Sequence, residues 1–442
     1  MSIKHDLEKY KIAVKNTNPI RMYGRVTQVI GLTIEALGPD SKIGDVCLVY
    51  PSTKNKPVKA EVVGFKNNRV LLMPLGELGA IGPGCDVINT GSPLKIKVGT
   101  PLLGRILNGL GEPIDGKKYP PGLRYYSTNQ SPPNPLQRKR ISEPIHLGIR
   151  AIDALTTIGK GQRIGIFSGS GIGKSTLLGM IAKNTSADVN VIALIGERGR
   201  EVNDFLEKDL GEEGLKRSVL VVATSDQPAL VRIKGAIIAT SIAEYFRDNG
   251  YNVNLMMDSI TRFATAQREV GLAIGEPPAT KGYTPSVFAL LPRLLERSGT
   301  NQFGTVTALY TVLVDSDDLN EPISDAVRGI LDGHIVLERK LANKGHYPAI
   351  DLLSSISRLM KDIVTKDHLT ASDKLKKLLA AYKEAEDLIN IGAYQKGTNP
   401  LIDKAVEYYP LIEKFTRQGI DEVSDFNESI NNLSKSFKEI NL

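Results

Sequence analysis

Residues 167–178, FSGSGIGKSTLL, bring three glycines, one lysine and four hydroxyl side chains together at the junction of two patterns. The preceding run RIGIF is typical of a buried strand, and the following run STLLGMIAK is typical of a helix. At such a junction, backbone N–H groups are free to face an anion, and the helix N-terminus adds a favourable dipole. The segment is therefore predicted to bind phosphate groups.

The residue types in this loop fit a nucleotide and its metal ion. The glycines allow a tight turn, Lys174 carries a charge that can reach the β- and γ-phosphates, and Ser175 offers a hydroxyl to Mg²⁺. The first glycine of the pattern G-x-x-x-x-G-K-[ST] is replaced by Ser168, and the alternative is a structural turn with a chance lysine. The predicted nucleotide-binding residues are Gly169, Ser170, Gly171, Ile172, Gly173, Lys174, Ser175 and Thr176.

Two further apolar runs end in charged residues. NVNLMMDS ends a predicted strand at Asp258, which would hold the Mg²⁺ shell or, alternatively, only cap the next helix. IALIGERGREVNDF places four charges after another strand, at Glu197, Arg198, Arg200 and Glu201. These could form a solvated loop, but beside a phosphate loop they are predicted to face the γ-phosphate, where hydrolysis needs a group that orients water.

Strands alternate with helices from about residue 94 to residue 365. Such alternation predicts a parallel sheet with helices on both faces. The predicted strands are RIGIFS, NVIALIG, SVLVVATS, VNLMMDS and TVTALYTVLV, with helical runs such as LVRIKGAIIATSIAEYFRDNG between them.

The flanking segments have a different texture. Residues 20–93 contain short β-rich runs punctuated by Gly, Pro and Asn, which indicates a small barrel or sandwich. Residues 371–392 and 399–418 are predicted helices, followed by a polar tail. Residues 1–18 are predicted to form a helix with one apolar face, made by Ile3, Leu7, Tyr10 and Val14.

Composition limits the class of protein. The chain has 442 residues, 41% of them hydrophobic and 24% charged, which is ordinary for a soluble protein. No apolar run approaches the roughly 18 residues that span a bilayer, and the start of the chain has no signal-peptide core, so a cytosolic protein is expected. The net charge of +7 permits acidic partners without requiring them. Cys47 and Cys85 are expected to be packed free thiols.

Four motifs together resemble the α/β-subunit family of rotary ATP synthases and its export-ATPase branch. They are GSGIGKST, IGERGRE, MMDSITRF and PAIDLLSSIS, and the last fits the family signature P-[SAP]-[LIV]-[DNH]-x-x-x-S-x-S at every fixed position. The resemblance implies an α/β fold in which a RecA-like P-loop domain, residues 94–365, lies between an N-terminal β-barrel, residues 19–93, and a helical C-terminal domain, residues 366–442. Residues 1–18 would form a separate partner-binding helix.

The resemblance also implies roles for individual residues. Glu197 matches the glutamate that activates the hydrolytic water, and Arg198 and Arg262 match contacts to the γ-phosphate. Glu201 and Asp258 match carboxylates that hold Mg²⁺ through water, beside the hydroxyl of Ser175. Arg358 matches an arginine finger that enters the neighbouring subunit's site, where charge that develops on the γ-phosphoryl group needs a cation.

The branch of the family is indicated by three segments. GYTPSVFALLPRLLERSG (282–299) and ATSDQPALVR (223–232) look like flagellar and type III export ATPases. DLINIGAYQKGTNPLIDKAVE (387–407) lacks the acidic run that rotary catalytic subunits carry. The resemblance therefore implies an ATP hydrolase of flagellar type III export that promotes unfolding and export of flagellar subunits. The injectisome ATPase of virulence secretion stays an alternative.

This family implies cofactors and partners as well. The cofactors are ATP and Mg²⁺, and the partners are six identical copies in a ring, a central stalk-like protein, export gate membrane proteins and chaperone-bound export substrates. A regulatory stator-like protein would bind residues 1–18, although the apolar face of this helix could equally pack on its own barrel. The expected location is the cytoplasm, at the inner face of the cell membrane.

Three rival interpretations remain. A rotary ATP synthase subunit shares the chemistry but is opposed by the missing acidic run. An RNA translocase of the transcription-terminator type needs aromatic side chains among basic ones in its barrel, and residues 20–93 hold only Tyr23, Tyr50 and Phe65, so no nucleic acid is expected. A nucleotide-binding scaffold without turnover is opposed by Glu197.

Overall fold

The computed structural model describes residues 10–11, 22–52, 56–314, 320–438 and 440. Contacts divide the chain into two compact units: one contains the residues up to Leu94 together with Ala273–Gly275, and the other contains Lys95–Leu272 and Glu276–Leu442. The predicted helix over residues 1–18 falls almost entirely outside the described residues. The predicted boundaries after residues 18, 93 and 365 stay predictions.

The first unit is a closed six-stranded barrel in the order β1-β2-β5-β4-β3-β6. Its interior is lined by alternate residues of each strand, including Val26, Ile34, Val49 and Val62. A two-residue turn at Asn67 and Asn68, both with positive φ, joins β4 to β5, as tight hairpins require. The strands are β1 (Tyr23–Ile30), β2 (Thr33–Leu37), β3 (Asp45–Tyr50), β4 (Val58–Lys66), β5 (Arg69–Pro74) and β6 (Asp86–Pro93). Of the two folds predicted for this segment, the barrel is confirmed and the sandwich is excluded. Cys47 and Cys85 are buried free thiols, as expected.

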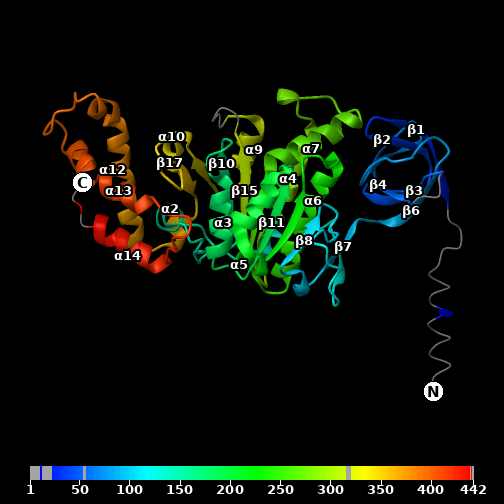
Figure 1. Cartoon of the computed structure of the whole chain (residues 1–442), viewed down its shortest axis with the longest axis horizontal. Helices are drawn as coiled ribbons and strands as arrows, with labels where there is room; N and C mark the ends of the chain where they lie inside the picture. Colours follow the sequence, from blue (N-terminus) through cyan, green and yellow to red (C-terminus); the bar gives the residue numbers. More distant parts are fainter. Residues whose placement is uncertain (1–9, 12–21, 53–55, 315–319, 439, 441–442) are drawn as a thin grey trace, which may run out of the picture. The chain divides into compact units, whose positions relative to one another are not determined.

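The second unit is built on a nine-stranded sheet in the order β17-β16-β10-β15-β13-β11-β12-β8, with β14 paired to β15 (Figure 1). The predicted parallel arrangement holds for the centre of the sheet, whereas β17 and β14 run antiparallel. The strands are β8 (Arg105–Asn108), β10 (Arg163–Ser168), β11 (Val189–Ile195), β12 (Ser218–Ala223), β13 (Asn252–Asp258), β14 (Gly299–Thr300), β15 (Thr305–Leu313), β16 (Gly333–Leu337) and β17 (Ile350–Ser357). A separate ribbon pairs β7 (Lys95–Val98) with β9 (Arg124–Ser127).

Helices cover both faces of the sheet, and central strands such as β11 are therefore buried along their whole length. Ile192 and Leu194 belong to the same core cluster as α3, whereas Ile195 faces α6, which comes so close that a Cβ at Gly235 would lie 2.9 Å from its Cδ1. The helices around the sheet are α2 (Arg150–Leu155), α3 (Lys174–Asn184), α4 (Gly199–Asp204), the π-helix η3 (Phe205–Leu210), α5 (Gly211–Lys216), α6 (Ala229–Asp248), α7 (Ile260–Ala273), α8 (Pro285–Leu295), α9 (Pro322–Ile330), α10 (Arg339–Asn343) and α11 (Met360–Ile363).

The C-terminal part consists of α12 (Lys366–Asn390), α13 (Pro400–Thr416) and α14 (Phe426–Phe437). The prediction of a polar tail after residue 418 is wrong. Leu433 and Phe437 lie one turn apart and are completely buried, so the polar residues between them occupy the other face of an amphipathic helix.

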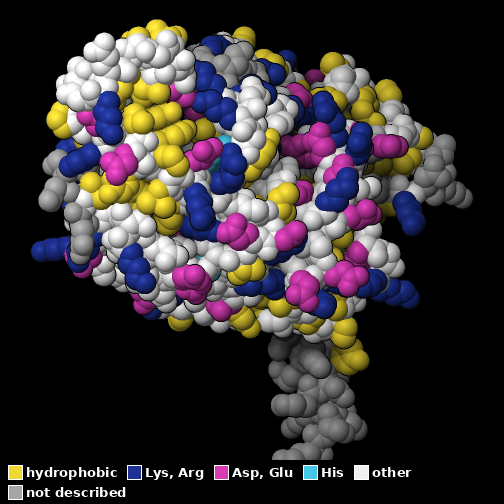
Figure 2. All heavy atoms as spheres, turned by 60° about the vertical axis from the view of Figure 1, so that its left-hand side comes forward, with side chains coloured by type: hydrophobic (Ala, Val, Ile, Leu, Met, Phe, Trp, Pro, Cys, Tyr) yellow, Lys and Arg dark blue, Asp and Glu magenta, His cyan; other side chains and the backbone are white. Residues whose placement is uncertain are grey.

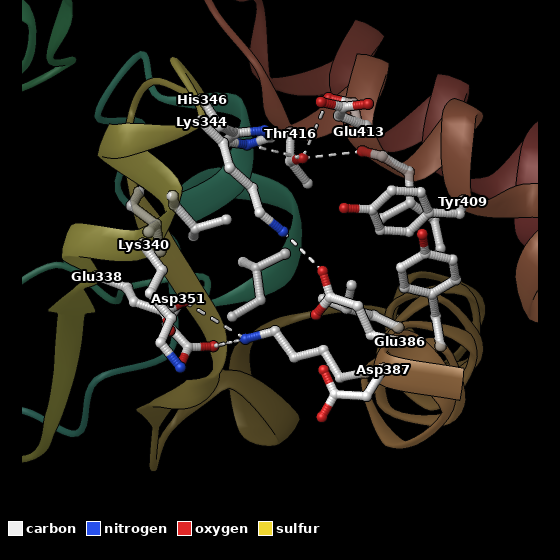
Figure 3. A pocket seen from close by; sticks show the side chains of 17 residues that line it. Glu338, Lys340, Lys344, His346, Asp351, Glu386, Asp387, Tyr409, Glu413 and Thr416 are labelled. Carbon is white, nitrogen blue, oxygen red and sulfur yellow. Dashed lines mark hydrogen bonds and ion pairs between the residues drawn. The ribbon is translucent and has the colours of Figure 1, made fainter. Parts of the chain in front are cut away.

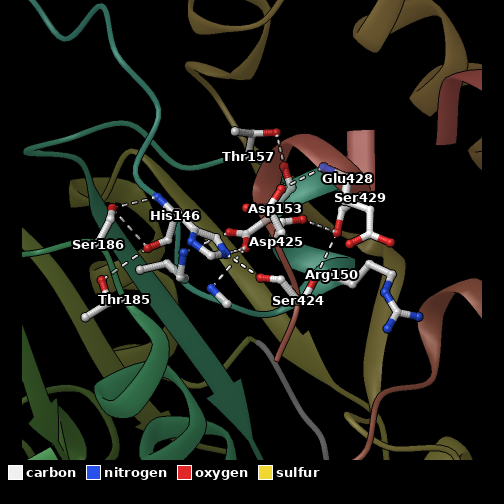
Figure 4. Close-up of polar contacts among 12 residues, drawn as sticks. His146, Arg150, Asp153, Thr157, Thr185, Ser186, Ser424, Asp425, Glu428 and Ser429 are labelled. Atoms are coloured by element: carbon white, nitrogen blue, oxygen red, sulfur yellow. Dashed lines mark hydrogen bonds and ion pairs between the residues drawn. The ribbon is translucent and has the colours of Figure 1, made fainter. Parts of the chain in front are cut away.

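The loop before α14 is anchored to the segment that leads into the sheet (Figure 4). His146 Nε2 lies 2.8 Å from the carbonyl oxygen of Ser424 and 3.2 Å from the carboxylate of Asp153. Arg150 forms an ion pair with Glu422 in the same loop. These contacts place the C-terminal helices and the sheet in one compact unit.

No helix in the described ranges is long and apolar enough to cross a bilayer. On the face shown in Figure 2, basic and acidic side chains are interspersed rather than separated.

Candidate active site

Four neighbouring strands bring the site together at the carboxyl edge of the sheet. In the order β10-β15-β13-β11, these strands lead to the phosphate loop, Thr311, Asp258 and Glu197. Crevices at the carboxyl ends of parallel strands are where α/β sheets bind ligands, because the loops that follow the strands meet there. Residues far apart in the chain therefore become neighbours.

The phosphate loop has the predicted local geometry. β10 ends at Ser168 and α3 begins at Lys174, with Gly171 at φ +78° and Gly173 at φ +90°. Both glycines adopt left-handed backbone conformations that side chains disfavour, which explains their presence in this loop. Ser170, Gly171 and Ser175 are exposed, as a loop that receives a ligand requires.

Lys174 lies between two carboxylates. Its Nζ is 2.5 Å from Asp258 Oδ1 and 3.7 Å from Glu197 Oε1, and the lysine side chain is only 11% exposed. Thr311 Oγ1 donates a second hydrogen bond to Asp258, at 2.7 Å. Burial opposes the charged lysine, but Asp258 and Glu197 outweigh it, so the pKa of Lys174 is raised.

Glu197, whose side chain is 12% exposed, has an unusual protonation equilibrium. Burial, followed by the charge of Asp258, raises its pKa to about 7, although Lys174 opposes the shift. Among the described residues, its Oε1 atom has no hydrogen-bond partner. A buried oxygen of this kind, with a pKa near neutrality, is suited to accept a hydrogen bond from a water molecule and to hold its proton.

Glu201 lies next to Glu197 but near the surface. A hydrogen bond between the two carboxyl groups is the main reason that the pKa of Glu201 is lowered, and the charge of Arg198 contributes. The structure therefore brings Glu201 to the edge of the cluster that Lys174, Glu197 and Asp258 form.

The arginines predicted to face the γ-phosphate are exposed and lie outside the cluster of Lys174, Glu197 and Asp258. Arg198 is exposed and pairs with Glu201 at 3.1 Å, and Arg200 is exposed beside Asp204. Arg262 is exposed on α7. Its side chain packs against Gly196, the residue before Glu197, since a Cβ at Gly196 would lie 2.7 Å from the Cβ of Arg262. Of the four charges that follow β11, Glu197 alone points into the buried cluster.

Arg358 lies at the opposite edge of the sheet. Its N–H donates to Asp332 O at 3.1 Å, and the N–H of Asp332 donates to Arg163 O at 2.9 Å. Arg163 begins β10, whereas the phosphate loop follows Ser168 at its other end, roughly 17 Å away at the usual rise of a strand. The structure therefore separates Arg358 from the phosphate loop of its own chain.

A cavity of about 510 Å³ adjoins the phosphate loop and was missed by sequence reasoning. Tyr347 lies against the loop, because a Cβ at Gly173 would be 3.4 Å from its Cε1. The backbone of Gln418 donates to Tyr347 O at 2.9 Å, which brings Arg417–Ile420 to the same cavity. The aromatic residue directly before the PAIDLLSSIS motif was the available signal for this cavity.

The donors present fit a magnesium ion that shares its shell with a bound phosphate. Among the described residues, no three His, Cys, Asp or Glu side chains form a cluster that could hold a metal ion without further ligands. Mg²⁺ commonly takes one or two protein oxygens together with substrate phosphates and water. The exposed hydroxyl of Ser175 and the carboxylates at the edge of the sheet supply oxygens of this kind.

The fold and the site define the chain as a P-loop ATPase. Three family models match it: the nucleotide-binding domain of the ATP synthase alpha/beta family over residues 148–357, the β-barrel domain of that family over residues 26–91, and the T3SS EscN ATPase C-terminal domain over residues 364–435. The chain belongs to the ATP synthase alpha/beta family, in its type III export branch.

Relatives agree with this placement along nearly the whole chain. It is 62% identical to the flagellum-specific ATP synthase of Bacillus subtilis (strain 168), over 94% of this chain and 95% of the relative. It is 48% identical to a type 3 secretion system ATPase of Xanthomonas euvesicatoria, over 94% of each chain. The prediction of an export ATPase that is closer to flagellar than to injectisome relatives is confirmed.

Solved structures show the same fold. The assembled ATPase EscN from the type III secretion system of enteropathogenic E. coli superposes with a TM-score of 0.87 at 49% identity, and covers 93% of this chain and 99% of its own. A second structure, EscN in complex with its central stalk EscO, gives a TM-score of 0.86 at 48% identity, with the same coverage of both chains.

Proposed function

We propose that this chain hydrolyses Mg-ATP to drive flagellar type III protein export. The observation that carries the proposal is the buried cluster of Lys174, Asp258 and Glu197 beside a cavity large enough for a nucleotide base. Glu197 favours a hydrolase over a scaffold that only binds nucleotide, because its buried oxygen and its pKa of about 7 suit a group that activates water.

Each part of the substrate has a place in this site. Residues 169–176 would hold the phosphates through backbone N–H groups, with Lys174 between the β- and γ-phosphates. The base would lie in the cavity against Tyr347 and between Ile172 and Ile420. Arg198 and Arg262 would contact the γ-phosphate after their exposed side chains turn inward.

Magnesium would be held by Ser175 directly and by Asp258 and Glu201 through water. The ion, when bound, neutralises charge that develops on the phosphates. Asp258 is well placed for this role, because Thr311 fixes one of its oxygens and the strand β13 holds its backbone.

We propose that the active form is a ring of six copies. Support comes from the two solved EscN structures, one described as assembled and the other in complex with its central stalk EscO. Arg358 adds a physical reason: it is exposed at the sheet edge opposite its own phosphate loop, so it can complete a neighbour's site only in an assembly. A central stalk-like protein would contact the ring.

Partners outside the ring follow from the same proposal. Residues 1–18 would bind a regulatory stator-like protein, and the cytoplasmic ring would meet export gate membrane proteins and chaperone-bound substrates. Removal of residues 1–18 should abolish co-purification with the regulator and leave ATP turnover intact. A large fall in melting temperature without any partner would instead show that the segment packs on its own barrel.

A gene deletion tests the cellular role. Loss of flagellar filaments with intact virulence secretion supports the proposal, and the reverse result assigns the chain to an injectisome. For the chemistry, purified protein should release phosphate from ATP only when Mg²⁺ is present. Binding of single-stranded RNA in a filter assay, or co-purification with a non-catalytic companion subunit, would favour the rival classes.

A further inference from the structure

Arg339 contacts the phosphate loop from outside the nucleotide cavity. It is the first residue of α10, and its Nη2 donates a hydrogen bond to the backbone oxygen of Ser170 at 3.1 Å. The contact follows from the sheet, because β16 pairs with β10 so that Leu337 lies opposite Ser168. The chain after Leu337 therefore passes beside the chain after Ser168, which is the phosphate loop.

The geometry of a peptide unit links this contact to the ligand side of the loop. The carbonyl of Ser170 and the N–H of Gly171 belong to one planar trans unit, so they point in opposite directions. Gly171 lines the 510 Å³ cavity, and Arg339 does not. An arginine that holds the carbonyl on one side thereby directs the N–H to the other side, toward the phosphates.

Gly171 needs such a constraint. Its φ of +78° lies in a region that glycine adopts readily and that other residues disfavour. Among the described residues, no atom lies within 4 Å of the position that a Cβ on Gly171 would take. No side chain is therefore packed against Gly171 on this side to fix its conformation. A charge-assisted hydrogen bond to the oxygen of the preceding peptide unit fixes that unit and polarises the N–H as a donor.

Ion pairs connect the residues on either side of α10 to α12 (Figure 3). Lys344, directly after the helix, lies 2.6 Å from Glu386 on α12. Glu338, directly before the helix, lies 3.6 Å from Lys383, which is also 3.2 Å from Asp351. The two pairs have opposite polarity, so they fix both the place and the direction of α10 against α12.

We propose that Arg339 is a positioning residue that aims the Gly171 N–H at the nucleotide phosphates, and that the ion pairs between α10 and α12 keep it in place. The packing of the C-terminal helices against α10 then influences how tightly the phosphate loop binds the nucleotide. This inference rests on the proposed nucleotide site and adds to it a residue that touches neither the nucleotide nor the metal.

The first test measures ADP affinity by titration calorimetry. Arg339→Gln should weaken ADP binding about three- to tenfold, the scale of one charge-assisted hydrogen bond acting indirectly, and Arg339→Lys should recover part of it. The matched control is Lys340→Gln, a neighbouring exposed cation of the same helix, which should bind ADP as wild type does. Unchanged ADP affinity in Arg339→Gln would overturn the inference.

The second test separates positioning from a general structural role. The sequence contains three Ser-Gly pairs, at 168–169, 170–171 and 298–299, so cell-free protein labelled with ¹³C-carbonyl serine and ¹⁵N-glycine gives three selected amide signals. Arg339→Gln should move the Gly171 signal and leave that of Gly299 in place. An unchanged chemical shift at Gly171, or equal shifts at Gly171 and Gly299, would contradict the proposal.

The third test addresses the ion pairs. Lys344→Glu should shift the Gly171 signal and weaken ADP binding, because two carboxylates would then face each other at residues 344 and 386. The double change Lys344→Glu with Glu386→Lys should restore both properties. Failure of the single change to alter either property would refute the coupling. If wild-type protein bound no ADP, the proposed function itself would fail instead.

Discussion

Lys174 Nζ lies 2.5 Å from Asp258 Oδ1, although 84 positions separate the two residues in the chain. The lysine begins the helix after β10, the aspartate ends β13, and β15 lies between these strands. Thr311 on β15 donates to the same carboxylate oxygen and so completes a row across the edge of the sheet. This row brings the cation for the phosphates and the carboxylate for the metal shell into contact.

Replacement of Lys174 should separate nucleotide affinity from folding. Lys174→Ala removes the cation that would face the β- and γ-phosphates, so affinity for a fluorescent ATP analogue should fall roughly ten- to hundredfold, and hydrolysis should be lost. The control is Lys183→Ala, which removes a cation from the last turn of the same helix. Unchanged affinity in the Lys174 variant would rule out this assignment.

Glu197→Gln should separate binding from turnover. The amide keeps the size of the side chain but cannot hold a proton taken from water, so Mg-ATP should bind while turnover falls by two or more orders of magnitude. Glu207→Gln, an exposed change on η3, should turn over ATP at the wild-type rate. Near-normal turnover in Glu197→Gln would assign activation of the water to another residue.

The raised pKa of Glu197 predicts a pH dependence. Because the group must be ionised to act, kcat/KM should fall as the pH drops through about 7, and a steady-state profile would show this limb. The free energy of unfolding changes with pH in the opposite direction to kcat/KM. The folded state keeps a proton that the unfolded state loses above its lower pKa, so rising pH between about 4.5 and 7 destabilises the wild type.

A comparison of melting temperatures checks that sign. Glu197→Gln carries no such titration, so its melting temperature relative to wild type should be higher at pH 8 than at pH 4.5. A relative gain at the acidic pH would contradict the raised pKa.

Tyr347 should contribute to binding of the base. Tyr347→Ala should weaken ATP binding by about 1–3 kcal/mol, the usual contribution of a base stacked on an aromatic ring. Tyr347→Phe keeps the ring and should bind ATP as tightly as wild type does. Tyr50→Ala, in the barrel, is the control. If ATP bound equally well to Tyr347→Ala, the base would have to lie elsewhere.

Arg358 should act on a neighbouring subunit. Arg358→Ala should bind ATP and fail to turn over, since arginines supplied in trans contribute roughly 10³–10⁵ in rate in other phosphoryl-transfer enzymes. Mixing this variant with Glu197→Gln, each inactive alone, should restore partial activity where an intact Glu197 meets an intact Arg358. Wild-type activity that stayed linear with concentration, down to monomeric protein, would reject a shared site.

Some features of this chain could be predicted from the sequence because they are local. The phosphate loop depends on glycine conformation and on a strand followed by a helix, both within 167–178. The central strands could be predicted because their apolar runs are buried on both faces. The helix after residue 418 was not predicted because its buried face is narrow: it consists of Ser429, Leu433 and Phe437, and one of these three residues is polar.

Contacts between distant segments were decided only by the tertiary structure. The sequence alone determined that Lys174 and Glu197 follow buried strands and that Asp258 ends one, and hence that the three residues share an edge of the sheet. The order of the strands placed Thr311 among them and brought Tyr347 to the phosphate loop, and the antiparallel direction of β17 placed Arg358 at the far edge. No local pattern records strand order, because it is set by packing of the whole sheet against its helices.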